Sequence, residues 1–273
     1  VTSTLAIQLI EEFNVQPDAV VGILLPRSVQ YLISYVAILK AGGAYMPLEL
    51  VYPKALLERA VTDTGCKVVL TNAMYANRVD GQEHIVLLDE APFVDVDISS
   101  PIIGRPTLVY PPPSYQRPHA DHLAFCVMSS GTTGTPKGIC QTHRAAVHSY
   151  RDRFTRFPYH VDVNVDGTVV SDRVGAGVFF VWELYRPLCQ GATCVIIPDH
   201  VLFDPEAVTS FIQDQDITRL LLTPSLLQLI LDSLGASVLQ HRLHSLRYLW
   251  LCGEVVSRDL AVTFAQLLPH VEL

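Results

Sequence analysis

The sequence lacks the features that would indicate a membrane or secreted protein. Hydrophobic residues make up 49% of its 273 residues, yet no apolar run reaches the roughly 20 residues that a helix needs to cross a bilayer. Residues 1–10 show no basic start followed by an apolar segment, so no secretory signal is visible. The six cysteines form no CxxC pair, and neither a His nor a second Cys pair accompanies Cys189 and Cys194. We therefore expect reduced thiols, no metal cluster among these residues and a cytoplasmic location.

Clustered positive charge is also missing. There are 19 Lys and Arg residues against 27 Asp and Glu, which gives a formal net charge of −8. Because no Lys/Arg cluster could follow a phosphate backbone, a nucleic-acid partner is not expected. No internal repeat is evident, and the sequence starts without Met. We read this as a sign that it is part of a longer chain.

Short apolar runs alternate with helix-like segments along most of the sequence. Alternation of this kind predicts an α/β fold in which helices cover a parallel sheet. Strands are expected at 19–25, 67–71, 84–89, 122–127, 168–171, 193–197, 217–222 and 246–251, and helices at 2–13, 28–40, 53–64, 142–154, 175–189, 205–215, 224–234 and 258–268. Seven prolines between residues 91 and 119 interrupt the pattern. We therefore predict two lobes, 1–118 and 119–273.

The most distinctive stretch runs from Met128 to Gly138, and every residue after Met128 is Gly, Ser, Thr, Pro or Lys. Glycine allows the backbone to curl around a ligand, while hydroxyl and N–H groups with a nearby Lys can surround an anion. The stretch is not a Walker loop, because Pro136 precedes Lys137 and a Gly follows it. A flexible linker fits poorly between the strand-like run before it and the helix-like run after it. The sequence therefore predicts a polyphosphate site.

This stretch resembles the phosphate-binding signature of the adenylate-forming superfamily, which includes acyl-CoA synthetases, luciferases and the adenylation domains of non-ribosomal peptide synthetases. Three further blocks match in the family's order: LKAGGAYMPL at 39–48, VWEL at 181–184 and LWLCGE at 249–254. The first is closest to the peptide-synthetase branch, although a helix end and a turn explain it structurally. The resemblance covers about the first half of an adenylation domain. It implies two sheet-and-helix lobes of the adenylate-forming large domain, truncated at the C-terminus.

The resemblance implies that a substrate carboxylate attacks the α-phosphorus of ATP, which yields an acyl adenylate and pyrophosphate. Lys137, Thr132 and Thr133 are the catalytic candidates that it places on the phosphates. The full nucleotide-binding set is Ser129, Ser130, Gly131, Thr132, Thr133, Gly134, Thr135, Lys137, Gly138, Gly253 and Glu254. The cofactors implied are ATP and Mg²⁺. Because most Mg²⁺ ligands, the ribose-binding Asp and the catalytic Lys would lie beyond residue 273, we expect residues 1–273 alone to be inactive.

The acyl pocket departs from the amino-acid-activating pattern. Relatives that activate α-amino acids carry Phe-Asp-x-Ser before Val-Trp-Glu, whereas this sequence places Val178 where the Asp would pair with the substrate ammonium. A buried ammonium without that partner is costly, so ordinary α-amino acids are doubtful substrates. The substrate-binding candidates carried over are Val178, Phe179, Trp182, Ser225, Trp250 and Cys252. Three aromatic rings without an acid suit either an apolar acid or a quaternary ammonium, as fungal glycine betaine reductases of this type would need.

Adenylation domains of this kind usually pass the acyl group to the phosphopantetheine thiol of a carrier-protein domain, here expected in the same chain, and a reductase domain can follow. The expected partners are thus a small carboxylic acid and the carrier, without membrane or nucleic acid. Two alternatives stay open at the level of sequence. One is a stand-alone acyl-CoA ligase, and the other is a non-catalytic nucleotide-binding or interaction domain, against which the intact phosphate loop argues.

Overall fold

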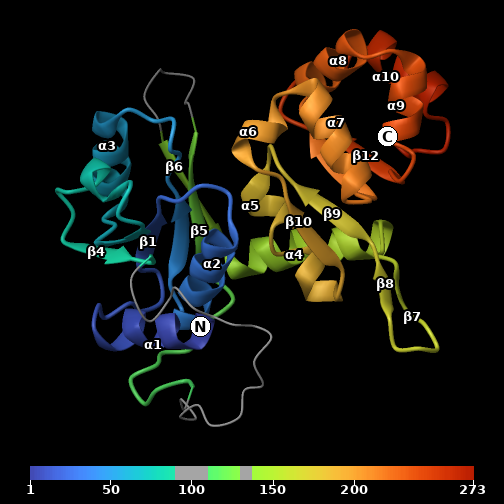
Figure 1. The fold of residues 1–273 in the computed structure, drawn as a ribbon. Coiled ribbons are helices and arrows are strands. Elements are labelled where there is room, and N and C mark those ends of the chain that lie inside the picture. Colours follow the sequence, from blue (N-terminus) through green and yellow to red (C-terminus); the bar gives the residue numbers. More distant parts are fainter. Residues whose placement is uncertain (90–109, 130–136) are drawn as a thin grey trace. The chain divides into compact units, whose positions relative to one another are not determined.

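The computed structural model describes residues 1–89, 110–129 and 137–273 (Figure 1). It divides the chain into two compact units, Val1–Asp152 and Arg153–Leu273. Within the described residues no helix is long and apolar enough to cross a membrane. Both units combine helices with a mainly or wholly parallel sheet, so the α/β fold class expected from the alternating pattern is confirmed.

The first unit is built on a six-stranded sheet in the order β4-β3-β1-β2-β5-β6. Its strands are β1 (Val20–Ile23), β2 (Ala44–Pro47), β3 (Val68–Thr71), β4 (His84–Leu87), β5 (Leu123–Ser129) and β6 (Lys137–Thr142), and its helices are α1 (Thr2–Glu11), α2 (Val29–Ala41), α3 (Lys54–Thr64), the 3₁₀ turn η1 (Ala76–Arg78) and most of α4 (His143–Arg156). Ser28 caps α2, because its Oγ accepts a hydrogen bond from Tyr31 N at 3.2 Å. Gly42 ends that helix in the left-handed conformation, with φ of 90°.

The segment after the phosphate loop differs from the sequence prediction. Instead of passing directly into a helix, the chain forms β6, which pairs antiparallel with β5 so that Lys137 lies opposite Ser129. Only then does the predicted helix α4 begin, with Thr142 Oγ1 accepting from Ala145 N at 3.3 Å. β6 is an exposed edge strand. Its pairing with the preceding strand β5, rather than its own apolar pattern, makes it a strand.

The unit boundary also lies elsewhere than the predicted one near residue 118. β5 pairs in parallel with β2 through Tyr45 and Phe125. This pairing places β5 and β6 in the sheet of the first unit, although both strands follow the proline-rich segment in the sequence. The compact units consequently divide between Asp152 and Arg153, within α4.

The second unit contains a four-stranded parallel sheet in the order β10-β9-β11-β12. Its strands are β9 (Arg173–Ala176), β10 (Thr193–Ile196), β11 (Arg219–Leu222) and β12 (Tyr248–Leu251), with a separate hairpin of β7 (Val161–Val163) and β8 (Val169–Ser171). The helices are α5 (Phe180–Glu183), η2 (Pro187–Gln190), α6 (Asp199–Leu202), α7 (Pro205–Asp214), α8 (Pro224–Ser233), α9 (Ala236–Arg242) and α10 (Arg258–Leu267). Most of these segments agree with the sequence prediction.

The exception is the single helix expected at 175–189. The structure instead has the end of β9, the short helix α5 and the turn η2. Gly175 belongs to β9, where a Cβ would come within 2.9 Å of Leu220 Cδ1, so the strand depends on a bare backbone at this point. Pro187 then begins η2 and prevents a continuous helix through this segment.

The two faces of the second sheet are chemically different. Leu220, Leu222 and Leu249 belong to the main apolar core, which also contains buried residues of α7, α8 and α10. Because successive strand side chains point to opposite faces, the alternate positions Arg219, Tyr248 and Trp250 belong to the other face. That second face carries the charged and aromatic groups described below.

Candidate functional site

Most of the predicted site residues of the second unit lie just after the strands of its sheet. Val178 and Phe179 follow β9, Ser225 follows β11, and Cys252 follows β12. Since the three strands are parallel, their carboxyl ends share one edge, which is where open α/β sheets bind ligands. The described structure thus places at one edge residues predicted separately for the nucleotide and for the acid.

Glu254 and Ser225 connect the segments after β11 and β12. The Glu254 carboxylate accepts hydrogen bonds from Ser225 N at 3.0 Å and from Ser225 Oγ at 2.8 Å. Thr223 caps the same helix, α8, by accepting from Leu226 N at 3.3 Å. An anionic group at a helix N-terminus is favoured by the partial positive charge there. This arrangement holds the Cys252–Glu254 segment against the first turn of α8.

Gly253 allows an aromatic ring to approach this segment. Its φ is +89°, and a Cβ at this position would lie 3.2 Å from Cζ of Phe179. Phe179 in turn stacks on Trp182, with ring centroids 5.5 Å apart and an interplanar angle of 6°. Trp182 is 36% exposed, so the stacked pair is open to solvent. Val178 packs against the main apolar core, and Cys252 is an exposed free cysteine.

Trp250 belongs to a second aromatic group. It stacks on Tyr248 with centroids 5.5 Å apart and an interplanar angle of 2°, while Phe157 meets it edge-on at 5.5 Å. The guanidinium carbon of Arg153 lies 3.7 Å from the centroid of the Trp250 ring. Within the described part of the chain, Trp250 makes no ring contact with Phe179 or Trp182. The three predicted aromatic residues therefore form two groups in this structure.

Two buried ion pairs belong to the same unit as the Trp250 group. Asp172 is 1% exposed and pairs with Arg219 at 2.8 Å. Glu183 of the VWEL block is 2% exposed, and its Oε1 lies 3.3 Å from Arg186 Nη1. Burial also lowers the pKa of Arg153 and raises the pKa of Tyr159 to about 12. Sequence reasoning missed Arg153 and the Asp172–Arg219 pair, because no local motif indicates contacts between segments far apart in the sequence. It also missed the Glu183–Arg186 pair, although the spacing of three residues was a local signal for it.

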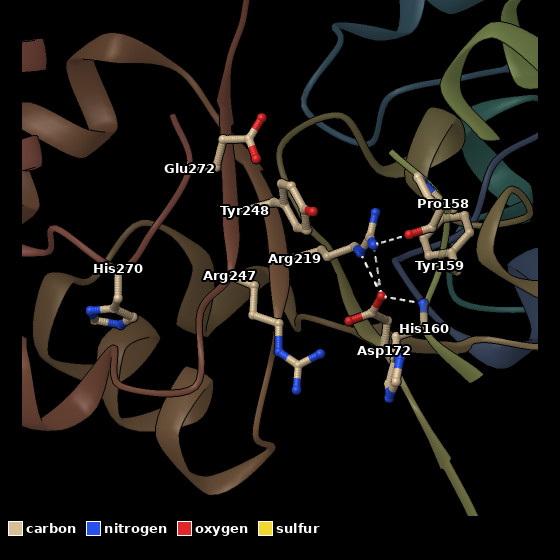
Figure 2. Close-up of a pocket in the computed structure, with 9 residues that line it drawn as sticks. All are labelled: Pro158, Tyr159, His160, Asp172, Arg219, Arg247, Tyr248, His270 and Glu272. Atoms are coloured by element: carbon tan, nitrogen blue, oxygen red, sulfur yellow. Dashed lines mark hydrogen bonds and ion pairs between the residues drawn. The ribbon is translucent and has the colours of Figure 1, made fainter. Parts of the chain in front are cut away.

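A polar pocket of about 450 Å³ lies near the amino ends of β9, β11 and β12 and includes the Asp172–Arg219 pair (Figure 2). Its lining residues are Pro158, Tyr159, His160, Asp172, Arg219, Arg247, Tyr248, His270 and Glu272. Arg219 lies between the rings of Tyr159 and Tyr248, 4.6 and 4.5 Å from their centroids. This pocket is at the opposite edge of the sheet from Ser225 and Glu254.

In the buried wall of this pocket, the polar groups around Asp172 are hydrogen-bonded to one another. Asp172 accepts hydrogen bonds from His160 N at 2.7 Å, Thr218 Oγ1 at 2.8 Å and Arg219 Nε at 2.8 Å. Burial raises the pKa of Asp172, but these hydrogen bonds and the Arg219 charge outweigh it and hold the pKa below its usual value. We assign the pair to stability of the unit, because its polar groups bind one another.

In the first unit, the predicted phosphate loop connects β5 to β6. Ser130, Gly131, Thr132, Thr133, Gly134 and Thr135 lie outside the described residues. Ser129 and Lys137 are paired across the two strands where the loop begins and ends. Gly138 is also closely packed, since a Cβ there would lie 3.1 Å from Cys126 Sγ. The two ends of the loop are thus fixed by a hairpin.

No group of three or more His, Cys, Asp or Glu side chains is arranged for a metal ion in residues 1–89, 110–129 and 137–273. His143, at the start of α4, has a buried Nε2 without a hydrogen-bond partner in the described chain. Burial, then the neighbouring His122, lowers its pKa, while Asp18 opposes the shift.

Comparisons with known proteins identify the family of this chain. The AMP-binding enzyme family matches residues 2–273. Glycine betaine reductase ATRR of Emericella nidulans is 40% identical over 267 residues, which are 97% of this chain and 19% of that protein. Malpinin synthetase of Mortierella alpina is 31% identical over 259 residues, covering 95% of this chain and 3% of that protein. The chain thus spans less than a fifth of either relative.

A solved structure shows the same fold. The nonribosomal peptide synthetase FmoA3 in its AMPPNP-bound form matches with a TM-score of 0.73 at 22% identity, over 99% of this chain and 27% of that one. The expected adenylate-forming architecture is therefore confirmed. Because the family match covers nearly every residue, this chain belongs to the AMP-binding enzyme family, as an adenylate-forming ligase domain of the kind found in non-ribosomal peptide synthetases.

Proposed function

We propose that the protein containing this chain activates a small carboxylic acid with ATP and transfers the acyl group to a carrier-protein phosphopantetheine thiol. A carboxylate oxygen forms a bond to the α-phosphorus while the bond between that phosphorus and the β-phosphate bridging oxygen breaks. The products are the acyl adenylate and pyrophosphate. The thiol then attacks the acyl carbon and releases AMP. The observation that carries this proposal is the family match over residues 2–273.

In this proposal the phosphate loop neutralises charge during the first step. Carboxylate and triphosphate repel one another, so the reacting groups must be held in line while negative charge grows on the leaving pyrophosphate. We assign Thr132, Thr133 and Lys137 to the phosphates. The β5–β6 hairpin supports the role of Lys137, because it fixes where the loop begins and ends. The other loop residues, Ser129, Ser130, Gly131, Gly134, Thr135 and Gly138, supply backbone and hydroxyl contacts.

We assign Gly253 and Glu254 to the nucleotide side of the second unit and the stacked pair Phe179–Trp182 to the acid. The close approach of Phe179 to Gly253 supports a shared boundary between these two subsites. Glu254 contributes by holding Ser225 in place, because its carboxylate accepts hydrogen bonds from the backbone N–H and the hydroxyl of Ser225. On this assignment, the Ser225–Glu254 pair fixes the relative position of the segments that bear the acyl and nucleotide contacts.

We propose glycine betaine as the acid, followed by reduction of the carrier-bound acyl group. Val178 offers no carboxylate to an α-ammonium, whereas a quaternary ammonium needs no hydrogen-bond acceptor and is attracted to aromatic faces. The 40% identical relative is named as a glycine betaine reductase, which supports the same acid. The six free cysteines suit a reducing compartment, and we propose the cytoplasm.

The test is ATP–pyrophosphate exchange by the full-length protein with three acids: glycine, glycine betaine and 3,3-dimethylbutanoate, the neutral isostere of glycine betaine. We expect exchange with glycine betaine and little with glycine. Preference for the neutral acid would contradict glycine betaine as the substrate and indicate an apolar acid, while adenylate formation itself would stand. Absence of exchange with a broad panel of acids would contradict adenylate formation. Release of acyl-CoA when free coenzyme A replaces the carrier would favour a stand-alone ligase.

A further inference from the structure

The face of Trp250 is already occupied by a positive charge from the protein. Tyr248 stacks against the indole, and the Arg153 guanidinium carbon lies 3.7 Å from the centroid of the Trp250 ring. Contact between a guanidinium and an indole face is an attractive electrostatic interaction. Trp250 thus acts as a cation-binding surface in this structure, and the cation that it binds is a side chain.

Among the neighbouring arginines in the described chain, Arg153 is the one whose guanidinium has no carboxylate partner. The other two arginines that influence it are paired, Arg219 with Asp172 at 2.8 Å and Arg186 with Glu183 at 3.3 Å. The guanidinium of Arg153 has neither an ion pair nor a hydrogen bond to any residue of the described chain. The side chain of Arg153 is half-buried, and this burial lowers its pKa. The guanidinium instead lies over the aromatic rings of Trp250 and Phe157.

Glu183 offers this guanidinium a second position. Its Oε1 is buried and accepts no hydrogen bond in the part of the chain that the structure describes. Its negative charge is also close enough to raise the pKa of Arg153 against the effect of burial. A buried acceptor without a hydrogen bond is unfavourable. A guanidinium that left Trp250 for Glu183 would supply the missing bond.

We propose that Arg153 is a specificity-determining residue whose guanidinium holds the face of Trp250 until the quaternary ammonium of the substrate takes that face and Arg153 moves to Glu183. This proposal rests on the proposed function with glycine betaine as the acid, and it takes Trp250 as part of the acyl pocket, as the resemblance to adenylation domains implies. The exchange replaces one cation by another on the indole. Displacing Arg153 costs any acid the same guanidinium–indole contact, and a cationic acid is in addition repelled by the guanidinium. Trp250 therefore favours a cationic acid, while Arg153 lowers the affinity for that acid more than for a neutral one.

The deciding experiment measures ligand binding to the full-length protein by calorimetry, independently of turnover. Arg153→Met removes the competing charge while keeping an unbranched side chain. We expect glycine betaine to bind roughly fivefold more tightly to this variant, because the internal competitor and its repulsion are both gone. The gain for 3,3-dimethylbutanoate should be smaller. Arg242→Met is the matched control, since Arg242 pairs with Glu206 on the surface, and it should leave both affinities unchanged.

Arg153→Lys provides a second arm in case the Met variant fails to fold. A lysine keeps the charge but is a more strongly hydrated, weaker partner for the indole, so its gain should be intermediate. Weaker glycine betaine binding in both variants, or equal gains for the two acids, would overturn the proposal. So would tight binding of a dicarboxylate to the unmodified protein that disappears in Arg153→Met, since Arg153 would then bind an anion. Pyrophosphate exchange in the same samples separately reports whether adenylate formation itself has failed.

Discussion

The carboxylate of Glu254 accepts two hydrogen bonds from Ser225, one from the backbone N at 3.0 Å and one from the hydroxyl Oγ at 2.8 Å. These two hydrogen bonds connect the segment after β12 to the first turn of α8. The sequence predicts Glu254 for the nucleotide and Ser225 for the acid. Because the two residues are in contact, a substitution at either one is expected to affect binding of both the nucleotide and the acid.

Ser225→Ala removes the hydroxyl contact and leaves the backbone contact in place. Because one hydrogen bond to a charged group is lost at an exposed position, we expect the free energy of unfolding to fall by roughly 0.5–1.5 kcal/mol. The Michaelis constants for ATP and for the acid should both rise. Urea unfolding and exchange kinetics measure the two effects, with Ser225→Thr as the hydroxyl-retaining control. An increase for the acid alone would show that the pair does not couple the subsites.

Lys137→Ala in the full-length enzyme should slow adenylate formation more than it weakens binding of the acid. Negative charge on the pyrophosphate grows in the transition state, so the lost contact is stronger there than in the bound substrate. The activation free energy should rise by roughly 2–4 kcal/mol. Single-turnover formation of the adenylate measures this change. Lys67→Ala is a suitable control, because Lys67 pairs with Glu83 on the surface.

Unchanged turnover of Lys137→Ala together with a higher Michaelis constant for the acid would contradict this role. It would indicate that Lys137 binds the acid and leaves the phosphates to other groups.

The parts of the fold that the sequence predicted well are those that depend on neighbouring residues. Ser28 and Thr142 begin helices through hydrogen bonds three residues further on, so their role can be read locally. β6 could not be predicted in this way, because it exists through its pairing with β5. The same distinction applies to the site. The segment after β12 was recognisable as a motif, whereas the position of Arg153 over Trp250 depends on α4 and β12 meeting in the folded unit.

Trp250→Leu should discriminate between the two acids. If the indole binds the quaternary ammonium, the variant should lose a contact worth roughly 2 kcal/mol when desolvated. The ratio of the specificity constants for glycine betaine and 3,3-dimethylbutanoate should then fall about thirtyfold by the usual conversion, because displacement of Arg153 from the indole affects both acids alike. Pyrophosphate exchange measures both constants. Equal losses for the two acids would indicate that Trp250 contributes shape rather than a cation-binding face.

Asp172→Asn should destabilise the second unit strongly. The substitution leaves Arg219, which is 3% exposed, without the opposite charge that it contacts at 2.8 Å. Breaking a buried ion pair from one side costs roughly 3–5 kcal/mol. Chemical denaturation measures the change. Asp162→Asn is the matched control, because Asp162 pairs with His160 at 2.8 Å on the surface and should contribute at most about 1 kcal/mol. A small effect for Asp172→Asn would contradict its structural assignment.

His143 should make the stability of the first unit depend on pH. Burial lowers the pKa of its imidazole in the folded protein, with His122 lowering it further and Asp18 opposing the shift. The unfolded chain therefore binds the proton more readily than the folded one as the pH falls. The contribution of neutral His143 is complete above the unfolded pKa of about 6.5 and is lost progressively as the pH falls below it toward the lower folded pKa.

Urea unfolding at a series of pH values between 7.5 and 5 measures this dependence. We expect the free energy of unfolding to decline as the pH falls through this range, and His143→Gln to flatten the decline because an amide does not titrate there. His148→Gln is the matched control, since His148 lies exposed on the same helix and should leave the slope unchanged. A slope that persists in His143→Gln but disappears when His122 is replaced would transfer the effect to that neighbour. An increase in stability toward low pH that His143→Gln abolishes would reverse the sign and contradict a neutral, buried imidazole.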